Sequence, residues 1–106
     1  MPNDNIVRGT TPTLKFTVPF STEEIQAAFV TMKQGGQIVI DKEAGKDGCA
    51  CNDKEISVTL TQDETLMLKA CQTIEIQIRI KDKDGNAFAS QIIKTFAEEI
   101  IKEGVI

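Results

Sequence analysis

The chain has 106 residues and a formal net charge of −4, and 41% of its residues are hydrophobic. This length and apolar content predict a single globular domain over residues 1–106, with a core that needs no disulfides or metals. The acidic balance argues against nucleic acid as a partner, because phosphate binding needs a basic surface. The absence of Trp and Tyr argues the same way, because bound bases stack on aromatic side chains.

The amino-terminal residues carry no membrane or export signal. No apolar run approaches the length of a membrane-spanning helix, and MPNDNIVRG lacks the basic start and apolar stretch of a signal peptide. We therefore expect no membrane partner and a protein that folds in a cytoplasm, where cysteines stay reduced. Residues 1–9 are polar and are expected to form an arm that is loose at its very end.

A strand and a helical turn are the first predicted elements. Apolar and polar side chains alternate along Thr13–Val18, which is typical of a strand with one buried face. Pro19 has no N–H to donate to a neighbouring strand, so this strand should stop there. Ser21–Glu24 has the spacing of a capping box, which predicts one helical turn.

A hairpin is predicted next. Residues 27–33 and 37–42 are expected to be strands, and the residues between them include Gly35 and Gly36. Glycine adopts positive φ without strain, so we expect a tight turn there. Residues 43–54 (EAGKDGCACNDK) are polar and contain two glycines, so they are expected to form a loop.

The second half begins with a strand and a capped helical turn. Glu55–Leu60 alternates and places its apolar residues on one face. Thr61–Glu64 is a second capping box, with acidic residues where a helix amino terminus favours negative charge. A helical turn or two should follow through residues 66–69.

A longer hairpin is predicted to close the domain. Thr73–Lys81 alternates, and its isoleucines share one face: Ile74, Ile76, Ile78 and Ile80. Asp82–Asn86 is expected to be the turn, and residues 87–95 the returning strand. The tail, residues 96–106, suits either a helical turn or an extension of that strand.

These elements predict an all-β fold. There are six clear strands, with a seventh from a broken edge or from the tail, and no crossover helices connect them. Strands with one apolar and one polar face are typical of antiparallel sheets, and two such sheets must bury their apolar faces against each other. The expected architecture is an antiparallel β-sandwich of six to seven strands with short helical turns.

The cysteines are the first residues that suggest chemistry. Cys49, Cys51 and Cys71 could supply part of a zinc site, but a structural site needs four ligands and the chain has no histidine. A disulfide involving Cys71 is another interpretation. A nucleophilic thiol is a third, and it would need a lowered pKa from a neighbour such as Lys46 or Lys54. Three reduced thiols without a site are the simplest interpretation, so we expect no metal and no cofactor.

The remaining groups of polar residues are weaker evidence for a binding or catalytic site. Asp82–Asn86 resembles part of a calcium loop, but aligning Gly85 with the invariant glycine puts Ile80 and Gln91 where carboxylate ligands belong. A hairpin turn is the better interpretation. The chain also lacks histidine, tyrosine and a glycine-rich phosphate loop, so we expect no catalytic residues and no enzymatic activity.

The most distinctive run precedes the first strand: Arg8, Gly9, Thr10, Thr11 and Pro12. Glycine permits a turn, proline fixes φ, and threonine side chains bond to the local backbone. The arginine is either a plain surface side chain or an anchor that binds a carboxylate or backbone carbonyls. These five residues are the candidate anchoring or interaction site.

The run RGTTPTLKFTV, residues 8–18, resembles the start of small proteins encoded by phages and prophages of Gram-positive bacteria, and of the amino-terminal domain of phage baseplate upper proteins. In that group an Arg-Gly-(Asp/Thr)-Thr-Pro motif precedes an immunoglobulin-like sandwich. The runs VTMKQGGQIVIDKE, ISVTLTQDETLML, IEIQIRIKDKDGNAFASQIIKT and IIKEGVI are similar too, so the resemblance covers nearly the whole chain. Thr10 stands where Asp is more frequent, and GCAC has no counterpart.

The resemblance implies an immunoglobulin-like sandwich and a non-enzymatic structural or interaction protein, associated with a phage tail or baseplate. Its partners would be other phage structural proteins and further copies of itself in a closed oligomer. It would be found in the cytoplasm of the bacterial host and in the virion. The alternative is a prophage binding module outside the virion, an assembly helper or an inhibitor of a host protein, whose acidic surface suits a basic partner.

Overall fold

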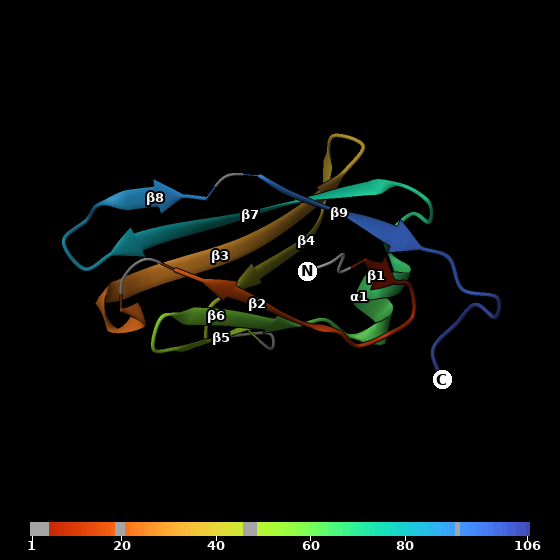
Figure 1. Ribbon diagram of the computed structural model, residues 1–106, viewed down its shortest axis with the longest axis horizontal. Coiled ribbons are helices and arrows are strands. Elements are labelled where there is room, and N and C mark those ends of the chain that lie inside the picture. Colours follow the sequence, from red (N-terminus) through yellow and green to blue (C-terminus); the bar gives the residue numbers. More distant parts are fainter. Residues whose placement is uncertain (1–4, 19–20, 46–48, 91) are drawn as a thin grey trace.

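The computed structural model describes residues 5–18, 21–45, 49–90 and 92–106. Figure 1 shows that most of these residues form strands and that a short α-helix lies at one end of them. The elements in chain order are β1 (Ile6–Val7), β2 (Thr13–Thr17), η1 (Thr22–Glu24), β3 (Ile25–Gln34), β4 (Gln37–Glu43), β5 (Cys49–Asn52), β6 (Glu55–Thr59), α1 (Gln62–Leu66), β7 (Thr73–Asp82), β8 (Ala87–Ala89) and β9 (Ile93–Glu98). Pro19, where the first predicted strand should stop, lies outside the described residues.

The strands pair into two sheets. The larger sheet has six strands in the order β1-β9-β7-β3-β4, with β8 also paired to β7, and the smaller sheet has the order β2-β6-β5. The two sheets share one core, which confirms the predicted all-β sandwich. Among the described strands, β1 departs from the expected antiparallel arrangement, because it runs parallel to β9 and pairs Ile6 with Ala97.

The core lies between the two sheets. The isoleucines of β7 are at most 7% exposed: Ile74, Ile76, Ile78 and Ile80. The smaller sheet contributes Ile56 and Val58, and Leu60 follows directly after β6; all three are fully buried. Every second residue of these strands therefore faces the core, as the predicted period of two requires.

The first predicted hairpin is confirmed. β3 and β4 pair antiparallel through Gln34 and Gln37, and the two residues between them, Gly35 and Gly36, have φ of +57° and +83°. Positive φ at both central positions matches the right-handed twist of the flanking strands, and glycine adopts it without strain.

Two strands arise where none was expected. β5 lies in the predicted loop and pairs antiparallel with β6. The loop prediction is wrong there because the side chain of Cys49 reaches the core and is only 3% exposed. β1 lies in the predicted polar arm, for which no strand was expected, and its Ile6 is 1% exposed. Both strands are short, so neither shows enough alternation for a strand to be recognised from sequence.

The predicted last strand, residues 87–95, is divided into β8 and β9. Ser90 lies at the break: its N–H donates to the carbonyl of Ile78 at 2.8 Å, and its Oγ accepts the N–H of Ile78 at 3.0 Å. The hydroxyl of Ser90 therefore takes the place of a backbone carbonyl as the acceptor. Pairing with β7 resumes at Ile93. β9 continues to Glu98, so the tail begins as strand and not as helix. The described residues thus contain nine strands, not six to seven.

Both predicted helical turns are present. η1 follows Ser21, whose Oγ accepts the N–H of Glu23 at 3.2 Å. α1 follows Thr61, and the capping box is complete, because Thr61 and Glu64 each bind the other's N–H through a side-chain oxygen. The helix ends at Leu66, earlier than the predicted turn through residue 69.

Candidate functional site

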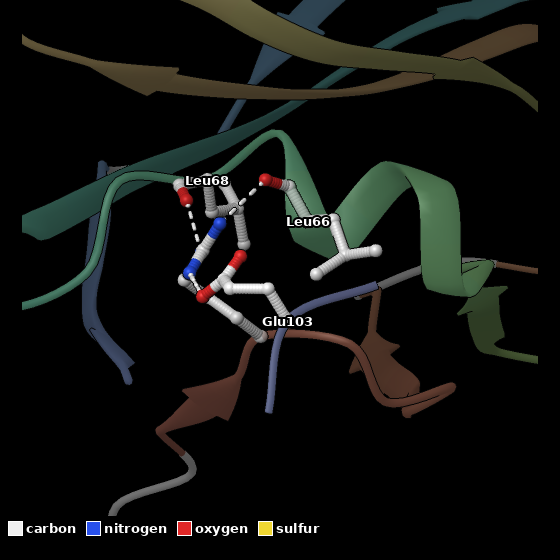
Figure 2. Close-up of polar contacts among 4 residues, drawn as sticks. Leu66, Leu68 and Glu103 are labelled. Carbon is white, nitrogen blue, oxygen red and sulfur yellow. Dashed lines mark hydrogen bonds and ion pairs between the residues drawn. The ribbon is translucent and has the colours of Figure 1, made fainter. Parts of the chain in front are cut away.

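The side chain of Arg8 makes three polar contacts at the helical end of the sandwich (Figure 2). Its Nε donates to the carbonyl of Leu68 at 2.7 Å, and its Nη2 donates to the carbonyl of Leu66 at 3.0 Å. Its Nη1 lies 2.6 Å from Oε2 of Glu103 in the carboxy-terminal tail. The Arg8 side chain is 15% exposed, so it is an anchor and not a plain surface residue.

These contacts complete the end of α1. The last carbonyls of a helix have no partner within the helix, and a cationic side chain is a favourable donor for them. Leu66 is the last residue of α1, and Leu68 lies just beyond it. The backbone of Arg8 contributes as well, because its N–H donates to the carbonyl of Glu98 at 3.0 Å and extends the pairing of β1 with β9.

Gly9 is required both by conformation and by space. Its φ is +77°, in the left-handed region where a side chain is strained. A Cβ placed there would lie 2.9 Å from Cδ1 of Ile100 and 3.6 Å from Cδ2 of Leu66. The chain thus turns against the helix and the tail at a point where a side chain is disfavoured.

The threonine and proline of the motif continue this connection. Oγ1 of Thr10 donates to the carbonyl of Val7 at 2.6 Å, and the carbonyl of Thr10 accepts a bond of 2.9 Å from Oγ1 of Thr65, which is fully buried. The carbonyl of Pro12 accepts the N–H of Leu60 at 3.0 Å, which begins the pairing of β2 with β6. Thr11 is exposed.

We call residues 8–12 the N-terminal clasp, because they join β1, β2, α1 and the tail. The structure brings all five predicted residues to one end of the sandwich, and four of them make contacts with parts of the chain distant in sequence or close the local turn. The charged group of the clasp is fully engaged by two carbonyls and one carboxylate, so its role within the chain is to fix the architecture.

The structure places the three cysteines in two kinds of environment. All three are free thiols, with Cys49 buried and Cys51 and Cys71 exposed. Burial, and next the nearby Cys51, raise the pKa of Cys49, and burial also raises the pKa of Cys51. A raised thiol pKa disfavours the thiolate that nucleophilic or redox chemistry needs. Within the described part of the chain, no three Cys, Asp or Glu residues gather closely enough to hold a metal ion.

The turn at Asp82 is structural, as predicted. Oδ1 of Asp82 accepts the N–H of Asp84 at 3.0 Å and of Asn86 at 2.8 Å, and Gly85 has a φ of +90°. These bonds, of which that from Asn86 contributes most, lower the pKa of Asp82. The carboxylate closes the turn between β7 and β8 and is occupied by backbone donors.

A partly buried ion pair was not predicted from the sequence. Lys42 faces the core from β4, its side chain is 4% exposed, and its Nζ lies 2.5 Å from Oε2 of Glu64. Burial alone would raise the pKa of Glu64, but the bond to Lys42 and those to Thr61 outweigh it and hold this pKa below its ordinary value. The pair links an edge strand to the start of α1. The signal was present, since Lys42 occupies an inward position two residues after Ile40.

A shallow depression lies where the start of β3, the end of β4 and Cys51 meet. Its volume is about 340 Å³, and Glu43 is the one charged residue in its lining. Small-molecule sites combine an apolar cavity with several convergent polar groups, and this lining does not provide them.

No protein-family model matches the chain, and no curated protein matches its sequence. None of the helices in the described ranges is long and apolar enough to cross a membrane.

Proposed function

We propose that this chain is a non-enzymatic structural or interaction protein of a phage or prophage, associated with the tail or baseplate and acting through protein–protein contacts. The observation that carries the proposal is the N-terminal clasp. The run that resembles baseplate upper proteins, residues 8–12, forms an ordered connection of both chain ends to the sandwich. A motif of this kind suits a domain that must present fixed surfaces to its neighbours.

The surface supports a role in contacts. Among the described residues, large apolar side chains are at least 38% exposed at ten positions: Phe29, Ile38, Met67, Phe88, Ile92, Ile93, Phe96, Ile101, Val105 and Ile106. Four of them lie in the tail, residues 96–106, where Ile101 and Ile106 are almost completely exposed. Exposed apolar groups and open sheet edges are the features that domains use to bind one another.

The deepest charged groups support a non-enzymatic role. Arg8 binds the end of α1, and Lys42 pairs with Glu64 next to the capping box. General acid–base chemistry requires such groups to meet in a cleft that admits a substrate. Here they connect elements of the sandwich instead.

The expected partners are other phage structural proteins and further copies of this chain. The protein would be made in the cytoplasm of the bacterial host and incorporated into the virion. A structural protein stays in the mature particle, whereas an assembly helper or an inhibitor of a host protein does not, so this difference separates the proposal from its alternative.

Mass spectrometry of gradient-purified particles from an induced host culture tests the proposal. We expect the chain at a fixed ratio to the tail proteins, and that ratio gives its copy number per particle. If the chain is abundant in the lysate but absent from the particles, the structural role is wrong, and pull-down of host proteins becomes the next experiment.

A further inference from the structure

Several strands lie at an edge of a sheet among the described residues, and β2 and β4 are the longest of them, with five and seven residues. An edge strand presents backbone N–H and C=O groups that can pair with another chain. In an antiparallel pair, every second residue directs these groups toward its partner strand, and the residues between direct theirs away. The hydrogen bonds therefore identify which residues face each open edge.

On β2 the open edge is formed by residues whose side chains are exposed. The N–H of Val18 donates to the carbonyl of Lys54 at 2.8 Å. Together with the register of β2 and β6, this bond shows which residues of β2 exchange backbone hydrogen bonds with β6. The backbone groups that point away from β6 belong to Thr13, Lys15 and Thr17. Lys15, at the centre of the strand, is the one charged residue of β2.

On β4 the open edge is acidic. The N–H of Ala44 donates to the carbonyl of Ala28 at 2.8 Å, so the backbone groups of Asp41 point away from β3. Oγ1 of Thr31 also donates to Oδ1 of Asp41 at 2.9 Å. This contact agrees with the assignment, because the side chains of paired residues lie closest where those residues share no backbone hydrogen bonds.

We propose that the protein binds a second copy of itself by antiparallel pairing of the open edge of β2 with the open edge of β4 of the second copy. The pairing places Lys15 opposite Asp41 of the second copy. This inference rests on the proposed function in one respect, namely that the protein acts through protein contacts. Opposite charges on directly opposed residues stabilise such a pair.

The charges favour this pairing over the two symmetric ones. Pairing β4 with β4 would set acidic residues opposite one another, and full overlap of β2 with β2 would set Lys15 opposite Lys15. Like charges at directly opposite positions are destabilising. Pairing β2 with β4 also keeps the exposed faces of both strands on one side, because opposed residues in an antiparallel pair point to the same face.

Sedimentation velocity of the full chain over a concentration series tests the proposal. We expect the wild type to associate, and K15E and D41K each to raise the dissociation constant roughly fivefold or more. The double variant K15E/D41K restores the opposite charges, so its dissociation constant should return to near the wild-type value. K33E is the matched control, since Lys33 is exposed on β3, which is paired on both sides.

A second variant examines the backbone without changing the partner's charges. K15P removes an N–H that points to the open edge, and proline is tolerated on an edge strand at such a position. It should weaken association while changing the melting temperature little. F16P is its counterpart, since the N–H of Phe16 points to β6, and it should lower the melting temperature.

Three results would overturn the pairing: a wild type that stays monomeric at every concentration, equal effects of K15E and K33E, or a double variant that fails to recover. None of them bears on the presence of the chain in the phage particle. A monomeric chain found in the particle leaves the proposed function standing, whereas an associating chain absent from the particle removes the structural role and keeps the pairing.

Discussion

Arg8 and Glu103 lie 2.6 Å apart between Nη1 and Oε2, although 95 residues separate them in the chain. The two side chains differ in environment, because that of Glu103 is 59% exposed and that of Arg8 is 15% exposed. An exposed ion pair is screened by water and salt, whereas bonds from a guanidinium to partly buried carbonyls are screened less. The stabilising part of the clasp is therefore the contact of Arg8 with Leu66 and Leu68.

Removing the guanidinium should cost much more stability than removing the carboxylate. R8A is expected to lower the free energy of unfolding by about 2 kcal/mol, since bonds with a charged partner contribute roughly 1.5–3 kcal/mol. E103Q should lower it by less than about 1 kcal/mol. Urea unfolding followed by circular dichroism measures both. R79A removes an exposed arginine and serves as the control, and equal losses for R8A and E103Q would contradict the assignment.

Substitution of Gly9 should be destabilising mainly through its backbone. G9A forces a side chain into a φ of +77°, which costs roughly 1–2 kcal/mol, and it pushes against Cδ1 of Ile100. G85A is matched in φ, at +90°, and its Cβ would meet nothing within 4 Å. Both variants should lose stability in urea unfolding, but only G9A should shift the methyl resonance of Ile100. An unchanged methyl resonance would show that the contact with the tail is wrong.

Much of the fold follows from local alternation, and the clasp does not. Val58 and Ile76 were placed correctly on the buried face because each lies in a run with a period of two. The buried position of Lys42 was not predicted, since a charged residue is expected to face water. The partners of Arg8 lie 58 to 95 residues away, and a single sequence carries no signal for contacts at that distance.

β5 is the other feature that could not be predicted. The residues Cys49–Asn52 contain neither a β-branched nor an aromatic side chain, and both enrich strands. What makes them a strand is pairing with β6 and burial of Cys49, which are properties of the assembled sandwich. Local propensity was overridden there by tertiary contacts.

The three cysteines should differ in reactivity. In the native protein we expect an aromatic disulfide reagent to modify Cys51 and Cys71, which are exposed, and to leave Cys49 protected. The thiol of Cys51 should react slowly at neutral pH and faster as the pH rises, because burial raises its pKa and the thiolate is the reactive form. Thiol titration with and without urea, followed by peptide mass spectrometry, identifies the sites. Rapid native labelling of Cys49 would contradict its place in the core.

The Lys42–Glu64 pair should make stability depend on pH. The folded protein holds the pKa of Glu64 below its ordinary value, so the pair contributes stability above the pKa of the unfolded chain, about 4.3. That contribution is lost as the pH falls through the lower pKa of the folded state, because the unfolded chain then binds the proton more readily. E64Q keeps the spacing of the capping box but removes the charge, so it removes the ion pair with Lys42.

We therefore expect E64Q to lower the free energy of unfolding by about 2–3 kcal/mol at pH 7, just under the range for fully buried pairs. The difference from the wild type should shrink between pH 5 and pH 3, where the wild type loses the same interaction by protonation. K42M should cost less than E64Q at pH 7, because it fills a buried position with an apolar side chain and leaves a carboxylate that water reaches. E99Q, at an exposed acid, is the control. A pH-independent difference between wild type and E64Q would mean that the carboxylate acts through the helix cap and not through Lys42.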